Sequence, residues 1–168
     1  MNPQRTGTGM IALACVLGLV TLTLFFGEVE DHQRNPNQSP ASSIVNNVIE
    51  VDLDRNRAGH YLVNGTINQQ EVEFLLDTGA TDVVIPEALA NRLGLTPGRP
   101  GRAMTANGVV TVYATTVPEL TIGDIKLYDV KASINPAMPP TAILLGMSAL
   151  SRLEFVQQGD SLTIRQPL

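Results

Sequence analysis

The sequence predicts a small, mostly β domain that begins near Ile44 and extends to the C-terminus. From this point the chain consists of short β-prone runs separated by turn residues. Asn107-Gly108 lies between two such runs, and Asn-Gly is among the strongest short-range signals for a hairpin. The runs that we expect to be strands are 48–53, 60–67, 72–76, 83–85, 103–105, 109–115, 119–122, 125–134, 154–157 and 161–165.

Only two short helices are expected among these strands. Pro86 opens the first, because Pro is tolerated in the first helical turn, and Gly94 supplies its C-terminal cap. The second is predicted near 148–153. A chain of 168 residues is long enough for one such domain with accessory segments.

The N-terminal segment is expected to be a membrane anchor. Residues 9–26 contain no charge, and about 18 residues is the lower end of what spans a bilayer core. Arg5 precedes the run and acidic residues follow it, which favours an N-terminus in the cytoplasm. We therefore expect a cytoplasmic N-terminus over 1–8, a transmembrane anchor over 9–27, a flexible tether over 28–45 and a folded domain over 46–168.

A cleaved signal peptide is the alternative for this segment. Cleavage sites need small residues at alternate positions, and Leu24-Phe25-Phe26-Gly27 lacks that pattern. An uncleaved anchor is therefore favoured. Cleavage near Gly27 would give a secreted soluble form, which changes the location of the domain but not its chemistry.

Composition argues against several classes of function. The net charge is −5 and no Lys- or Arg-rich run is present, so we expect no nucleic-acid partner. Arg92, Arg99 and Arg102 lie among Gly and Pro and are expected to be solvated loop charges. His32 and His60 are the only histidines, too few for a histidine-based metal site or a serine triad. We expect no metal and no cofactor.

One short motif carries a candidate chemistry. Asp77-Thr78-Gly79-Ala80 occurs once and directly follows the apolar run 72–76. An acid on a tight turn at the end of a buried strand is a candidate for activating water. Aspartic-protease chemistry needs two carboxylates that share one proton, because like charges a few ångströms apart cannot both ionise. A single copy therefore predicts a symmetric dimer as the working unit.

The order of motifs along the chain resembles that of the retropepsin-like aspartic proteases (clan AA), in particular their bacterial, membrane-anchored single-domain branch. The resemblance covers roughly residues 48–168 and implies a closed β-barrel with one or two short helices that is active as a homodimer. It rests on Leu-Leu-Asp-Thr-Gly-Ala-Thr (75–81), a helix that ends in Leu-Gly-Leu (93–95), a hairpin with Ala-Asn-Gly (106–108), and Ile-Leu-Leu-Gly-Met-Ser (143–148).

The resemblance also implies a role for each residue of the site. Asp77 would be the catalytic carboxylate, Thr78 would bond across the dimer axis, and Gly79 would let substrate backbone pass close to the acids. A flap at 106–108 would close over the substrate. Asp82 is either a polar group on the substrate side or a solvated turn residue. The implied substrate-binding residues are Ala80, Thr81, Asp82, Thr105, Ala106, Asn107 and Gly108.

Two positions depart together from the retroviral pattern. Where those proteases carry an acid after the Ala and an Arg after Leu-Leu-Gly, this chain has Thr81 and Met147. In the family those two residues form an ion pair that supports the dimer. Losing both partners leaves no unpaired charge, although it changes what holds the dimer together.

The resulting expectation is a membrane-anchored homodimeric aspartic endopeptidase that hydrolyses protein or peptide substrates. Its single-pass helix would lie in a bacterial inner membrane, with the protease domain on the periplasmic side. The alternative is a non-catalytic binding or dimerisation module with the same fold. An intact Asp77 argues against that alternative, because packing alone does not require a carboxylate.

Overall fold

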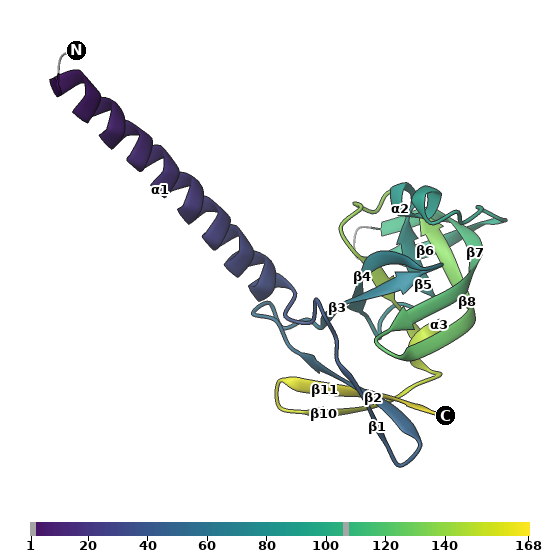
Figure 1. Cartoon of the computed structure of the whole chain (residues 1–168). Helices are drawn as coiled ribbons and strands as arrows, with labels where there is room; N and C mark the ends of the chain where they lie inside the picture. Colours follow the sequence, from purple (N-terminus) through teal and green to yellow (C-terminus); the bar gives the residue numbers. More distant parts are fainter. Residues whose placement is uncertain (1–2, 106–107) are drawn as a thin grey trace.

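The computed structural model describes residues 3–105 and 108–168, and in that part of the chain a long N-terminal helix leads into a mostly β body (Figure 1). The helices are α1 (Pro3–Arg34), α2 (Glu87–Arg92) and α3 (Met147–Leu150). The strands are β1 (Ser42–Val45), β2 (Val48–Asp54), β3 (Leu62–Ile67), β4 (Gln70–Leu76), β5 (Val83–Pro86), β6 (Pro100–Thr105), β7 (Gly108–Ile122), β8 (Ile125–Asn135), β9 (Ile143–Leu145), β10 (Glu154–Gln158) and β11 (Ser161–Pro167).

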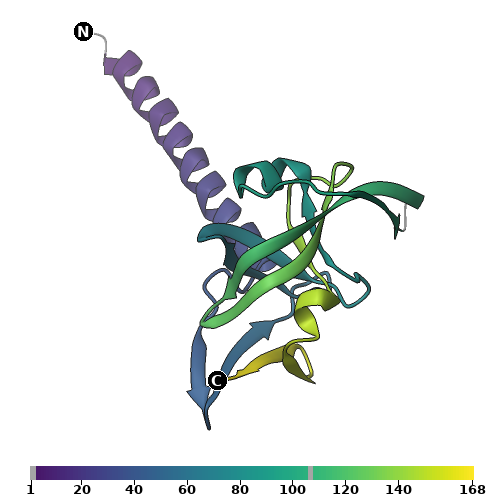
Figure 2. The same ribbon diagram turned by 90° about the vertical axis from the view of Figure 1, so that its right-hand side faces the viewer.

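The larger sheet has the strand order β3-β4-β9-β5-β8-β7-β6. β3 also pairs with β7, through Thr66 with Thr121 and Ile67 with Leu120. This extra pairing brings the first strand of the order next to the sixth. The hairpin of β6 and β7 extends from the body on the side away from α1 (Figure 2).

The smaller sheet has the order β1-β2-β11-β10 and lies at the end of the body away from α2 (Figure 1). Its buried side chains, such as Val51, Leu53 and Ile164, belong to the same apolar cluster as Ile122 and Ile125 of the larger sheet. One continuous core therefore connects the two sheets.

Within the part of the chain that the structure describes, α1 contains a segment that could cross a membrane. Within it, Leu13–Arg34 is 22 residues long and apolar enough to span a bilayer, and its most apolar stretch is not buried in the body. An N-terminal signal sequence has the same length and composition. The predicted apolar helix is therefore present, and its length and composition fit either an anchor or a signal sequence.

The segment expected to be a flexible tether, residues 28–45, is structured. α1 continues to Arg34, and β1 occupies Ser42–Val45. Asn35 and Asn37 are buried, and their side chains bond to the body. The turn-forming composition of this segment misled the prediction because its Asn side chains form tertiary hydrogen bonds rather than remaining solvated.

Most predicted strands are present, with shifts of a few residues at their ends. The expected strands 109–115 and 119–122 are one strand, β7, which runs through Pro118. β7 pairs with β8 through Val117 and Val130 before Pro118, and through Glu119 and Tyr128 after it. Asp129, which lies opposite Pro118, has a φ of 50°. A local irregularity therefore accommodates a residue that has no N–H to donate.

Candidate active site

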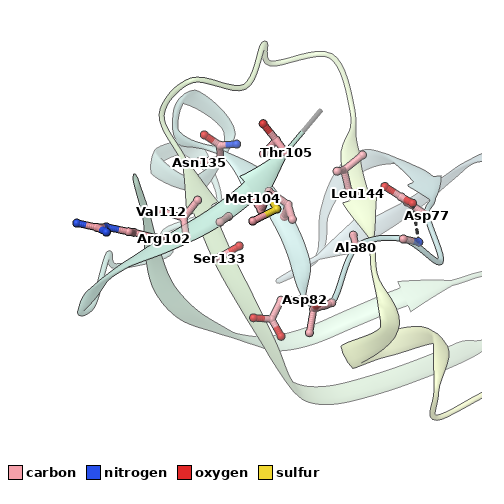
Figure 3. A pocket seen from close by; sticks show the side chains of 14 residues that line it. Asp77, Ala80, Asp82, Arg102, Met104, Thr105, Val112, Ser133, Asn135 and Leu144 are labelled. Atoms are coloured by element: carbon pink, nitrogen blue, oxygen red, sulfur yellow. Dashed lines mark hydrogen bonds between the residues drawn. The ribbon is translucent and has the colours of Figure 1, made fainter. Parts of the chain in front are cut away.

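Asp77 lies on the turn that follows β4. Its N–H donates to the carbonyl of Leu145 at 3.1 Å, and its own carbonyl accepts the N–H of Ala80 at 3.2 Å. The N–H of Gly79 donates to Oδ1 of Asp77 at 2.9 Å, which is the bond drawn in Figure 3. Asp77 is partly exposed, so the turn fixes the carboxylate while leaving it accessible.

β9 supports this turn from below because it lies between the two strands that the turn connects. It pairs in parallel with β4, Leu76 with Leu145, and in antiparallel with β5, Val84 with Leu144. Residues 77–82 therefore pass over the end of β9. Leu144, Leu145 and Gly146, which belong to the motif at 143–148, thus lie beneath the turn.

The turn and the end of β9 approach each other most closely at Gly146. A Cβ at this position would collide with the carbonyl oxygen of Asp82 and would lie 2.7 Å from that of Ala80. The following residues bond to the same turn: the N–H of Met147 donates to Ala80 at 2.8 Å and that of Ser148 to Thr81 at 2.9 Å. Backbone hydrogen bonds thus connect the start of α3 to the turn. They involve Thr81 and Met147, the two positions that carry an ion pair in the retroviral proteases.

The turn forms one wall of a pocket of about 650 Å³. β8 supplies a second wall, and β6, which leads into the flap predicted at 106–108 and is called the flap strand below, lies over the pocket, as Figure 3 shows. The lining residues are Asp77, Gly79, Ala80, Thr81, Asp82, Val84, Arg102, Ala103, Met104, Thr105, Val112, Ser133, Asn135 and Leu144.

Among the described residues two carboxylates line this pocket, and they differ in their partners. Oδ1 of Asp82 lies 3.2 Å from Nζ of Lys131, so its charge is balanced by an adjacent cation. Asp77 has no ion-pair partner among the described residues and accepts its hydrogen bond from Gly79. Asp77 is therefore the carboxylate available to act on a ligand.

Six of the residues predicted for the site line the pocket, namely Asp77, Gly79, Ala80, Thr81, Asp82 and Thr105. Thr78 is exposed and instead lines a neighbouring groove of about 210 Å³ with Tyr61, Leu76 and Phe155. Gly108 begins β7, where its carbonyl accepts the Thr105 hydroxyl at 2.8 Å. Ala106 and Asn107 lie outside the described residues.

Several lining residues were not found by sequence reasoning. Arg102, expected to be a solvated loop charge, is exposed but lies on the flap strand β6 at the outer end of the pocket. Ser133 and Asn135 alternate with the apolar Ala132 and Ile134 at the end of their strand, and this polar i, i+2 pattern was the available signal. The remaining residues, Val84, Ala103, Met104, Val112 and Leu144, are apolar and gave no signal that separates pocket from core.

Comparison with known proteins identifies the family. Residues 63–152 match the family model described as gag-polyprotein putative aspartyl protease. The chain is similar to a solved retropepsin-like aspartic protease from Rickettsia conorii, with a TM-score of 0.61 and 28% identity. That match covers 76% of this chain and 96% of the other.

Two uncharacterised bacterial proteins are also similar. One, from Sinorhizobium sp., is described as lying in the cobV 5' region; it is 29% identical, and the match covers 96% of this chain and 76% of that protein. The other, from Rickettsia prowazekii, is 27% identical over 62% of this chain and 46% of its own length. The family match spans the Asp77 turn, the flap strands and β9, and on this basis the chain belongs to the retropepsin-like aspartic protease family.

Proposed function

We propose that this protein is a membrane-anchored, homodimeric aspartic endopeptidase with Asp77 as its catalytic carboxylate. The observation that carries the proposal is the position of Asp77: an accessible carboxylate without an ion-pair partner among the described residues, at the edge of a pocket that a flap strand covers. The family match supports the same reaction class.

The proposed reaction uses Asp77 of two chains. One carboxylate is ionised and takes a proton from water, which attacks the carbonyl carbon of the peptide bond. The other is protonated and donates a hydrogen bond to the carbonyl oxygen, which stabilises the charge that develops there. The flap excludes bulk water while this occurs. Because the pair must hold one shared proton, activity is expected from acid to neutral pH and to fall at alkaline pH.

The single acid of the turn supports the dimer. Asp82 is paired with Lys131, so a second free carboxylate has to come from another chain. Thr78 lies beside Asp77 and is exposed at the neighbouring groove, which makes it available to a partner turn. In this arrangement the strands β3 to β9 form the closed barrel of each protomer.

The N-terminal helix supports anchoring. We propose that residues 9–27 cross a bacterial inner membrane, with residues 1–8 in the cytoplasm and the domain from residue 46 onward in the periplasm. The acidic residues after the apolar run, together with Arg5 before it, favour this orientation. The body would then act on proteins or peptides that reach the outer face of that membrane.

The test compares the full chain with its Asp77→Asn variant on a mixed peptide library, from acid to neutral pH. Asp77→Asn should reduce cleavage by at least about 10³-fold, because an amide can neither take nor give the required proton. Asp124→Asn, at an exposed turn, is the matched control and should retain full activity. Equal cleavage by the two proteins, or none by either, would reject the enzyme and favour a non-catalytic binding module.

A further inference from the structure

Two buried polar side chains stand out in the pocket wall formed by β8. Ser133 and Asn135 each have only 8% of their surface exposed, and both line the pocket. Their neighbours in the strand, Ala132 and Ile134, belong to the apolar core on the opposite face. The alternation of the strand thus places one hydroxyl and one carboxamide on the wall that faces a ligand.

A hydrogen bond fixes the orientation of the Asn135 carboxamide, because it is made by the oxygen and not by the nitrogen. The N–H of Ala137 donates to Oδ1 of Asn135 at 3.0 Å. The reversed orientation would set two donors against each other, so Oδ1 must face Ala137. Nδ2 then has no acceptor in the described part of the chain, and the Ser133 hydroxyl has no side-chain hydrogen bond there either.

The rest of this region offers few groups that could satisfy those donors. Val84, Val112 and Leu144 supply apolar surface around them. The carboxylate of Asp82 is held by Lys131, and the Thr105 hydroxyl donates to the carbonyl of Gly108. In the open pocket, water can accept from Ser133 and Asn135. A substrate that displaces this water with an apolar side chain would leave both donors unpaired.

We propose that this wall selects substrates whose side chain ends in an oxygen acceptor. Asn, Gln, Asp or Glu at the corresponding substrate position would accept from Nδ2 of Asn135 and from the hydroxyl of Ser133. The selected ligand is therefore a peptide with an amide or acidic side chain near the scissile bond. The inference rests on the proposed function to the extent that the ligand of this pocket is a peptide.

The test measures binding, so that it does not depend on catalysis. The full chain carrying Asp77→Asn, in detergent micelles, is titrated with fluorescent peptides that differ by Asn or Leu at one position, which is moved along the peptide. Asn and Leu are close in size, so the pair isolates the acceptor. At one position the Asn peptide should bind about tenfold more tightly.

A second variant reverses the chemistry of the wall. Asn135→Asp, added to Asp77→Asn, keeps an oxygen for the N–H of Ala137 but replaces the Nδ2 donor by an acceptor. The preference for Asn over Leu should shrink at least about threefold, and a peptide with Asp at that position should lose affinity. Ser133→Ala should weaken the preference for Asn without altering the hydrogen bond from the N–H of Ala137 to Asn135. Asn91→Asp, at an exposed position of α2, is the control with the same change of charge and should leave the preference intact.

The outcomes separate this inference from the proposed function. Acceptor-selective binding without cleavage by the chain with intact Asp77 would reject the protease and retain the selective wall. Cleavage of Asn and Leu peptides at equal rates, with equal binding, would retain the protease and overturn the inference. Failure to bind any peptide, or an unchanged preference in the folded Asn135→Asp variant, would also overturn it.

Discussion

Gly146 is the residue on which the geometry of the Asp77 turn depends most directly. Because a Cβ at this position would collide with the carbonyl of Asp82, only a residue without a side chain lets β9 approach the turn. The same close approach allows the N–H of Met147 to reach the carbonyl of Ala80. The position of Asp77 thus depends on a glycine that directly follows another strand, β9.

Gly146→Ala is expected to lower the free energy of unfolding by about 2 kcal/mol or more, because the turn and β9 must move apart. Activity should fall even at temperatures where the variant is folded, since Asp77 moves with the turn. Thermal and urea unfolding followed by circular dichroism measure the first effect. Gly101→Ala is the control, because its Cβ would meet its nearest neighbour, the carbonyl of Val112, at an ordinary 4.0 Å. Equal stability of the two variants would contradict this account.

Among the residues of the site, the sequence predicted the acid and missed part of the surface around it. Asp77 could be found because its motif is local and follows a recognisable strand. Asn135 could not, because its place in the pocket depends on the pairing of β8 with β5, Asn135 with Pro86. Such a register between distant segments is set by tertiary packing rather than by local pattern.

At the scale of elements, the junction between α1 and the body is held by a compact polar network. The side chain of Asn37 donates to the carbonyls of Asp54 at 2.9 Å and Leu62 at 2.6 Å, and it accepts the N–H of Asp54 at 2.7 Å. Arg34, the last residue of α1, bonds Glu73 of β4 through both guanidinium nitrogens. The helix is therefore fixed to the body rather than loosely tethered.

Asn37→Ala should release this junction. It removes the partner of the buried carbonyl of Leu62 and of the part-buried N–H and carbonyl of Asp54, and is expected to cost about 2 kcal/mol of stability. Limited proteolysis should then cut residues 35–45 several times faster, and the melting temperature should fall. Ser39→Ala, at an exposed position in the same segment, should change neither. A protease-resistant junction in the Asn37 variant would argue against the fixed connection.

The flap strand β6 presents an apolar side chain to the pocket. Met104 lines the pocket and is 89% exposed, so it contributes little to the folded core. Met104→Ser should raise KM about three- to tenfold with an unchanged melting temperature, because only packing against bound substrate is lost. Steady-state kinetics on one cleaved peptide measure this. Ile44→Ser, also exposed but on β1, is the control. An unchanged KM would show that the flap does not contact substrate.

The elements also show where local sequence pattern is insufficient. The composition of β1 predicts part of the tether, although Asn46 and Asn47 adopt φ values of 50° and 65° and connect it to β2 as a hairpin. Asn tolerates this left-handed backbone, so the pair was a usable turn signal. β1 itself gave no strand signal, because it begins with Ser-Ser, which resembles the composition of a linker.

For the molecule as a whole, the proposed dimer would supply a carboxylate that the described part of one chain's pocket lacks. The described part of the pocket holds Asp77 and the lysine-paired Asp82, and aspartic-protease chemistry needs two carboxylates that share a proton. The Thr81 and Met147 positions carry no charges with which to hold a dimer. Confinement of α1 to one membrane would raise the effective concentration of a weakly associating pair.

Mixing intact and Asp77→Asn chains tests this assembly directly. If each active site takes one Asp77 from each of two chains, random pairing of equal amounts gives active dimers as about one-quarter of the total. Activity should then fall to about a quarter of that of the intact protein, whereas independent monomers would retain about half. The two chains are co-expressed, quantified by mass spectrometry and assayed in vesicles. Asp124→Asn mixed with the intact chain is the control and should retain full activity. A linear dependence on the intact fraction would mean that each chain works alone, with a single Asp77.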